Sequence, residues 1–250
     1  MDSTSENKKS IVIIKDLKKS YGDNCVLDGF NMELNEGENL VIMGKSGSGK
    51  SVMIKCLIGL EEPDSGSIEV MGKNIGKLSR EALDELRTEV GFLFQGSALY
   101  DSMSVRENLE FPLRRHTKKF GIIKDTRPLV MEALENVGLA HTIDLMPNEL
   151  SGGMKRRIAL ARTLILMPKI ILYDEPTTGL DPITSKEILM LMMSIQKKYN
   201  TSSLIITHDV DCARMISNRM ILLIDGVNYA EGTFESLAAS TDPKVKAFFK

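Results

Sequence analysis

A run of glycine, serine and lysine at residues 44–51 has the spacing of a phosphate-binding loop. Its members are Gly44, Lys45, Ser46, Gly47, Ser48, Gly49, Lys50 and Ser51, followed by Val52. Glycines let backbone N–H groups turn inward around phosphate oxygens, and the start of a helix aims its partial positive charge at the same oxygens. Lys50 can reach the β- and γ-phosphates, and the Ser51 hydroxyl can ligate Mg²⁺. We therefore expect the whole run and Val52 to contact a nucleotide.

Two acids, Asp174 and Glu175, end an apolar stretch that predicts a strand over residues 169–174. Ligands of open parallel sheets bind beyond the carboxyl ends of the strands. We expect Asp174 to hold Mg²⁺ beside the glycine loop, and Glu175 to orient and deprotonate an attacking water, as a general base does. Alone, a strand ending in Asp-Glu is also typical of a solvated strand end; the glycine loop favours the catalytic interpretation.

A second glycine motif, Ser151-Gly152-Gly153, opens a helical pattern over residues 151–166. Ser151 is a preferred N-cap type, and apolar residues from Met154 to Ile165 recur at helical spacing. On its own this motif predicts only a capped amphipathic helix after a turn.

The elements that must position these residues alternate between strand and helix patterns. Strands are predicted at residues 11–14, 30–34, 39–43, 67–71, 90–94, 169–174, 203–207 and 219–224, and helices at 52–60, 80–87, 105–110, 128–137, 151–166 and 183–199. The alternation predicts an α/β fold with a mostly parallel sheet wrapped by helices. Between residues 96 and 150 β-branched runs disappear, which predicts a helical insertion.

The composition excludes several classes of protein. With 250 residues, 32 Lys and Arg, 34 Asp and Glu and a net charge of −2, the chain is neither disordered nor collagen-like, and it carries no basic excess for nucleic acid. Cys25, Cys56 and Cys212 fit neither a disulfide framework nor a zinc site. No apolar stretch approaches the roughly 20 residues of a membrane span, and we expect neither a signal peptide nor an anchor at the polar start.

The motifs, taken in order, resemble the nucleotide-binding subunit of an ABC transporter over about residues 11–232. Residues 150–154 resemble the signature loop of that family, and residues 176–181 resemble the segment that ends in its D-loop. Gln95 stands at the Q-loop position, and His208 at the switch-histidine position just past a strand. Tyr21 stands where the family stacks an aromatic ring on adenine, although a simply packed ring is the other interpretation.

The resemblance implies ATP and Mg²⁺ as ligands and a P-loop ATPase fold with an N-terminal antiparallel β part. Ser151, Gly152 and Gly153 would contact the γ-phosphate of ATP bound to another copy of the chain. Gln95 would sense Mg²⁺, His208 would contact the γ-phosphate and position the water, and Asp181 would act across the dimer interface.

One phosphate loop and one signature loop per chain then imply a head-to-tail homodimer around two ATP molecules. Met154 stands where the family usually has Gln, which removes any contact from that side chain but leaves the backbone and Ser151 contacts. We expect hydrolysis to persist, at a slow rate without the membrane partner.

Further stretches narrow the resemblance to ATPases of Mce-associated lipid transporters, of the maintenance-of-lipid-asymmetry type. They are residues 94–103, 111–116, 146–149, 181–184 and 240–249. This resemblance implies phospholipid movement between inner and outer membranes, polytopic permease subunits, an Mce-domain partner and a position at the cytoplasmic face of the inner membrane. A different ABC importer and a soluble ABC ATPase that serves no transporter stay open as alternatives.

The expected organisation has four parts. Residues 1–10 form a flexible start, and residues 11–232 form the ATPase domain. Its helical insertion at about residues 96–150, including Tyr100, Asp101 and Phe111, is the expected docking surface for the permease. Residues 233–250 form a tail in which Phe248 and Phe249 pack on this subunit or on its dimer mate.

Overall fold

The computed structural model describes residues 9–121 and 123–249, so most of the expected flexible start lies outside the described residues. A six-stranded sheet forms the centre of the molecule, in the order β10-β9-β3-β8-β7-β6. Its strands are β3 (Asn39–Met43), β6 (Val90–Leu93), β7 (Ile170–Asp174), β8 (Ser202–Thr207), β9 (Arg219–Ile224) and β10 (Val227–Gly232). Only the β9–β10 pair is antiparallel, which confirms the predicted mostly parallel sheet.

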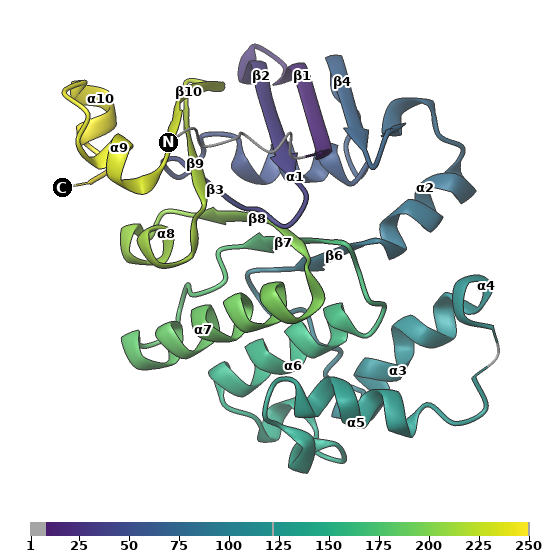
Figure 1. The fold of residues 1–250 in the computed structure, drawn as a ribbon. Coiled ribbons are helices and arrows are strands. Elements are labelled where there is room, and N and C mark those ends of the chain that lie inside the picture. Colours follow the sequence, from purple (N-terminus) through teal and green to yellow (C-terminus); the bar gives the residue numbers. More distant parts are fainter. Residues whose placement is uncertain (1–8, 122, 250) are drawn as a thin grey trace, which may run out of the picture.

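A second sheet is antiparallel and lies on the side of the molecule opposite the helical part (Figure 1). It contains β1 (Ser10–Tyr21), β2 (Asn24–Asn35), β4 (Ser65–Val70) and β5 (Lys73–Asn74) in the order β2-β1-β4-β5. This sheet confirms the antiparallel part that the family resemblance implied. The first two strands are much longer than expected, because irregularities in register carry the pairing past positions where the apolar alternation breaks.

The two faces of the central sheet belong to different apolar clusters. In β3, Leu40 and Ile42 join the cluster that contains the antiparallel sheet and α1 (Lys50–Leu57). Their neighbours Val41 and Met43 point the other way, as strand geometry requires, into the cluster of the flanking helices. These helices are α6 (Gly152–Leu164), α7 (Pro182–Tyr199) and α8 (Val210–Ile216). The strand that leads into the glycine loop is therefore buried on both faces.

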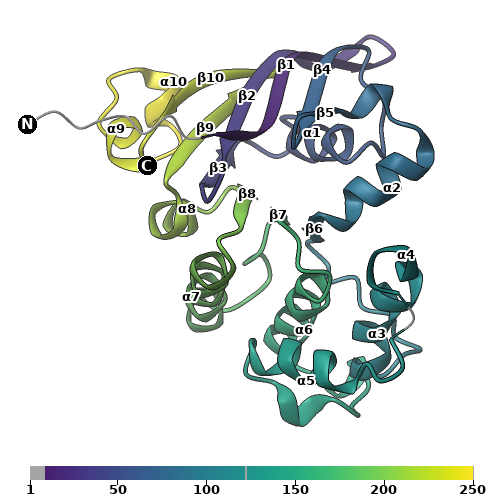
Figure 2. The same cartoon turned by 45° about the vertical axis from the view of Figure 1, so that its right-hand side comes forward.

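The segment from residue 96 to 150 is helical and has an apolar cluster of its own, built with one face of α6. It contains α3 (Val105–Arg115), α4 (Thr117–Phe120), α5 (Arg127–Glu135) and the short 3₁₀ turns Ala140–Thr142 and Pro147–Glu149. Ser104 and Glu107 form a reciprocal capping box at the start of α3, which fixes where that helix begins. The second view shows this helical part projecting below the central sheet (Figure 2).

Several elements of the structure were missing from the sequence prediction. They are β5, β10, α4, α8, α9 (Phe234–Ala238), α10 (Pro243–Lys246) and the three short 3₁₀ turns, of which one is Ile75–Lys77. The helix expected at residues 80–87 is α2 (Arg80–Thr88). In the tail, the rings of Phe249 and Phe234 pack edge-on at 5.4 Å, and Phe248 and Phe249 also pack against the apolar cluster of the flanking helices, so the tail docks on its own chain. Across the described residues, none of the helices has the length and apolar character needed to span a bilayer.

Candidate active site

Four neighbouring parallel strands bring the expected site residues to one edge of the central sheet. β3, β8, β7 and β6 lie side by side, with Met43 opposite Thr207 and Asp174 opposite Ile206. The glycine loop follows β3, His208 follows β8, Glu175 follows β7 and Gln95 comes two residues after β6. Because parallel strands share the direction of their carboxyl ends, segments far apart in sequence meet here.

The glycine loop adopts backbone geometry that only glycine allows without strain. Gly47 and Gly49 have φ of +78° and +100°, and a Cβ at Gly49 would lie 2.9 Å from the carbonyl oxygen of Val26. A Cβ at Gly44 would lie 2.4 Å from Ser48 Oγ. That Ser48 hydroxyl is itself buried without a hydrogen-bond partner among the described protein atoms. The loop is thus a tight backbone cradle with an unused polar group, which suits a bound anion.

Lys50 lies folded into this cradle and is only 8% exposed. Its Nζ donates to the carbonyl oxygens of Gly44 at 2.7 Å and Lys45 at 2.9 Å. Burial lowers the pKa of Lys50, while the nearby charges of Glu175 and Asp174 act to raise it. The ammonium group is therefore bound by the loop, within electrostatic range of both carboxylates.

Glu175 is held in a strained backbone conformation, with φ of +50°. Its N–H donates to the carbonyl oxygen of Ile206 at 2.9 Å, which ties the residue to β8. Oε2 accepts hydrogen bonds from Thr178 Oγ1 at 3.1 Å and from Thr207 Oγ1 at 3.4 Å, and Oε1 lies 2.8 Å from His208 Nδ1. Both carboxylate oxygens are thus oriented by this chain alone.

The pKa of Asp174 is raised, whereas the pKa of an acid in a salt bridge is lowered. Burial raises its pKa, the charge of Glu175 raises it further, and Lys50 opposes both. The negative charge of a half-buried carboxylate beside a second carboxylate is not fully balanced by the positive charges around it. The site therefore favours the arrival of a cation.

The available ligands fit Mg²⁺ bound together with a nucleotide. Within residues 9–121 and 123–249, no group of three or more His, Cys, Asp or Glu side chains could hold a metal ion by itself. Asp174 and the exposed Ser51 and Gln95 supply a few oxygen ligands only. Mg²⁺ commonly completes its shell with phosphate oxygens and water, so this sparse set suits it.

The second glycine motif forms the exposed start of α6. Ser151 Oγ accepts a hydrogen bond from the N–H of Met154 at 3.2 Å, which confirms the expected N-cap. A Cβ at Gly153 would lie 2.7 Å from Thr184 Cγ2, so α6 begins in close contact with α7. Ser151 and Gly152 are exposed, and their role toward ATP of another copy stays a prediction.

Two further predicted residues have partners within their own chain. Asp181 caps α7, accepting from the N–H groups of Ile183 and Thr184 at 3.0 Å, and hydrogen bonds from Thr184 lower its pKa. Tyr21 is 46% exposed, and its hydroxyl donates to the Glu61 carboxylate. Neither contact tests the expected roles at the dimer interface and at adenine.

The sequence interpretation missed Thr178, Thr207 and Arg156. The first two orient Glu175, and Arg156 is a buried arginine of α6 that donates to the carbonyl oxygen of Phe94. Thr178 falls within the segment compared with the D-loop, which could have drawn attention to it. Nothing local in the sequence distinguishes Arg156 from a surface arginine.

Comparisons with known proteins agree with this geometry. A family model described as ABC transporter matches residues 27–178. The probable ribonucleotide transport ATP-binding protein mkl of Mycobacterium leprae is 42% identical over 94% of this chain, which spans 67% of that protein. The intermembrane phospholipid transport system ATP-binding protein MlaF of Haemophilus influenzae is 38% identical over 97% of this chain and 91% of its own.

Two other similarities bear on function and assembly. The methionine import ATP-binding protein MetN of Clostridium tetani is 41% identical over 86% of this chain and 67% of its own. The dimeric, post-hydrolysis structure of the ATP-binding cassette MJ0796 bound to ADP and Pi has a TM-score of 0.80 and 33% identity. It covers 89% of this chain and 98% of its own. The chain thus spans about two thirds of the length of mkl and MetN, but nearly all of MlaF.

Proposed function

The chain belongs to the ABC transporter ATP-binding family, and we propose that it hydrolyses ATP to drive phospholipid transport between the inner and outer membranes of a bacterium. The observation that carries the ATPase part is the meeting of Lys50, Asp174 and Glu175 at one sheet edge. The lipid part is supported by the similarity to MlaF over 97% of this chain.

The residues divide the chemistry among them. The cradle of residues 44–51 and Lys50 bind the phosphates, while Asp174 and Ser51, with Gln95, hold Mg²⁺, which neutralises phosphate charge. Glu175 takes the proton of the attacking water, and His208 helps to position that water and the γ-phosphate. The hydrogen bonds to both Glu175 oxygens hold the carboxylate ready before ATP binds.

The active unit is a head-to-tail dimer in which Ser151, Gly152 and Gly153 of one copy complete the site of the other. The exposure of Ser151 and Gly152 supports this arrangement, and so does the dimeric assembly of the similar cassette MJ0796. Asp181 and the Tyr21 ring take their expected places at the dimer interface and at adenine.

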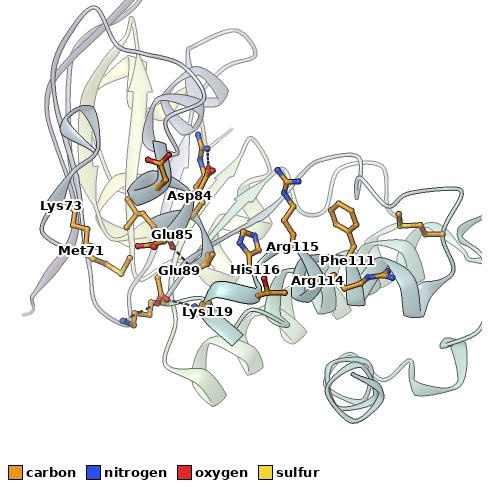
Figure 3. Close-up of a pocket in the computed structure, with 17 residues that line it drawn as sticks. Met71, Lys73, Asp84, Glu85, Glu89, Phe111, Arg114, Arg115, His116 and Lys119 are labelled. Carbon is orange, nitrogen blue, oxygen red and sulfur yellow. Dashed lines mark hydrogen bonds and ion pairs between the residues drawn. The ribbon is translucent and has the colours of Figure 1, made fainter. Parts of the chain in front are cut away.

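A groove beside the helical part is the proposed seat of the permease. It has a volume of about 1410 Å³ and lies between α2 and α3. Asp84 and Glu85 line one wall, and Phe111, Arg114 and Arg115 line the other (Figure 3). Phe111 also packs against Tyr100 at 5.0 Å, so two of the expected docking residues form one aromatic patch. A permease segment with charges of both signs suits this groove.

Through such a permease the chain would sit at the cytoplasmic face of the inner membrane, with an Mce-domain protein as a further partner. The second candidate is an ATPase of another importer, and the 41% identity to MetN favours it. A soluble ABC ATPase acting on nucleic acid has less support, since the net charge of −2 offers no basic footprint.

Affinity purification of the chain from membranes in mild detergent, with mass spectrometry of proteins and lipids, tests the proposal. A permease, an Mce-domain protein and bound phospholipid are expected. A different permease would retain the ATPase mechanism and discard the lipid substrate, and no membrane partner at all would overturn the transport function. A Phe111→Glu variant should lose the permease but keep the ATPase rate of the isolated chain.

A further inference from the structure

Arg156 joins three segments that carry site residues. It lies in the second turn of α6 and is only 4% exposed. Its Nη1 donates to the carbonyl oxygen of Phe94 at 2.7 Å, and its Nη2 donates to the carbonyl oxygen of Thr178 at 3.4 Å. One guanidinium therefore connects the helix behind Ser151 with two chain segments 62 and 22 residues away.

Both acceptors are next to groups of the proposed ATP site. Phe94 directly precedes Gln95, and the Thr178 side chain donates to Glu175 Oε2 at 3.1 Å. The two hydrogen bonds of Arg156 thus go to backbone carbonyls beside the site, and they fix the backbone next to Gln95 and the backbone of Thr178, which orients Glu175. A displacement of about 1 Å in such a support can cost a large factor in rate.

The surroundings of Arg156 do not compensate for the burial of its charge, so stability alone does not explain an arginine at this position. Burial is the cause that lowers its pKa, and among the described ion pairs none links it to a carboxylate. Its Nε is also buried, with no hydrogen-bond partner in the part of the chain that the structure describes. The rigid fork of the guanidinium can serve two carbonyls at once, which a lysine ammonium on a flexible stem does less well.

A second arginine of α6 provides a comparison. Arg162 donates to the carbonyl oxygens of Ala98 at 2.8 Å and Ser97 at 3.3 Å, just beyond Gln95. Ser97 and Ala98 have φ of +62° and +49°, so Arg162 supports a strained loop. Arg162 holds the Gln95 segment alone, whereas Arg156 also reaches the Glu175 segment.

We propose that Arg156 is a positioning residue that couples the Gln95 segment and the α6 signature helix to the orientation of Glu175, through Thr178. This inference rests on the proposed ATPase function. When the Gln95 segment shifts with nucleotide or permease, Arg156 passes the shift to Thr178 and hence to the general base. The coupling acts on the chemical step and leaves binding at the glycine loop unchanged.

Steady-state ATPase kinetics of the full chain test this role. Arg156→Met should lower kcat by on the order of tenfold to a hundredfold with KM within about twofold, and Arg156→Lys should recover part of the loss. Thr178→Val should lower kcat as well. Because both residues act on Glu175 through one connection, the double variant should be little worse than the more severe single variant.

Arg157→Met is the matched control, since Arg157 is the next residue of the same helix but pairs with Glu187 and donates to the carbonyl oxygen of Val137, neither of which belongs to the proposed ATP site. It should keep most of the wild-type kcat. A multiplicative loss in the double variant, a rise in KM at unchanged kcat, or an equal loss in Arg157→Met would overturn the inference. If Arg156→Met fails to fold, the kcat and KM values of Arg156→Lys and Thr178→Val still test the inference. An inactive wild-type chain would instead contradict the proposed function itself.

Discussion

His208 Nδ1 lies 2.8 Å from Glu175 Oε1, which joins the residues that follow two adjacent strands of the central sheet. The side chain of Glu175 is 12% exposed and that of His208 is 65% exposed, so a largely buried carboxylate is in hydrogen-bond contact with an exposed imidazole ring. With Thr178 and Thr207 on the other oxygen, residues of this chain orient both oxygens of the Glu175 carboxylate.

Replacing Glu175 by Gln keeps the shape of the side chain but removes the base. We expect Glu175→Gln to bind ATP, to hold the dimer closed and to hydrolyse on the order of 10²–10⁴-fold more slowly. Single-turnover hydrolysis and size-exclusion chromatography with ATP check both parts. Turnover near the wild-type rate would remove Glu175 from the role of general base.

Lys50 acts at the binding step. Lys50→Ala removes the charge that lies in the cradle, where it donates to the Gly44 and Lys45 carbonyl oxygens. We expect ATP affinity to fall by on the order of tenfold or more, because one charge-assisted contact to phosphate is lost. Isothermal titration with the wild-type chain as reference measures this. Unchanged affinity would contradict the assignment of residues 44–51 to phosphate binding.

The ionised side chain of Asp174 should lower the free energy of unfolding of the protein measured without nucleotide. Since its pKa is raised in the folded state, stability decreases as the pH rises from the ordinary Asp pKa through the raised value. We expect Asp174→Asn to abolish Mg²⁺-dependent hydrolysis and to increase the unfolding free energy at neutral pH, because the amide carries no charge to bury.

The difference in melting temperature between Asp174→Asn and wild type should shrink as the pH falls through the raised pKa of Asp174, and it should vanish only below the ordinary Asp pKa, where Asp174 is protonated in both the folded and the unfolded state. Thermal melts without nucleotide at several pH values measure it. A variant that is less stable than wild type, or a difference that does not change with pH, would contradict a raised pKa of Asp174 in the folded protein.

Much of the fold was predictable because buried parallel strands and glycine motifs leave local signals. The missed elements lack such signals: α8 (Val210–Ile216) is too short to display a helical period, although Cys212, Ala213 and Ile216 are buried. The contacts of Arg156 were not predictable, since they depend on Phe94, which only the packing of α6 near the end of β6 brings within reach.

Ser151 has a structural role that can be separated from its proposed role toward ATP. Ser151→Ala removes the N-cap of α6 and should cost about 1 kcal/mol of stability. Ser151→Asp keeps a capping oxygen but places a negative charge where the γ-phosphate of the other copy is expected. We predict that only Ser151→Asp abolishes ATP-dependent dimerisation of the Glu175→Gln chain, as light scattering would show. Equal dimerisation by both variants would refute a phosphate contact.

The central claim is that each ATP site is shared between two copies, and mixing two inactive variants tests it most directly. Lys50→Ala lacks a working glycine loop, and Ser151→Asp lacks a working signature loop. A one-to-one mixture should regain ATPase activity that neither variant shows alone, because each mixed dimer holds one intact site, made of the glycine loop of the Ser151→Asp chain and the signature loop of the Lys50→Ala chain. No recovery, with mixed dimers demonstrated by cross-linking, would place both loops in one chain's own site and contradict the shared site.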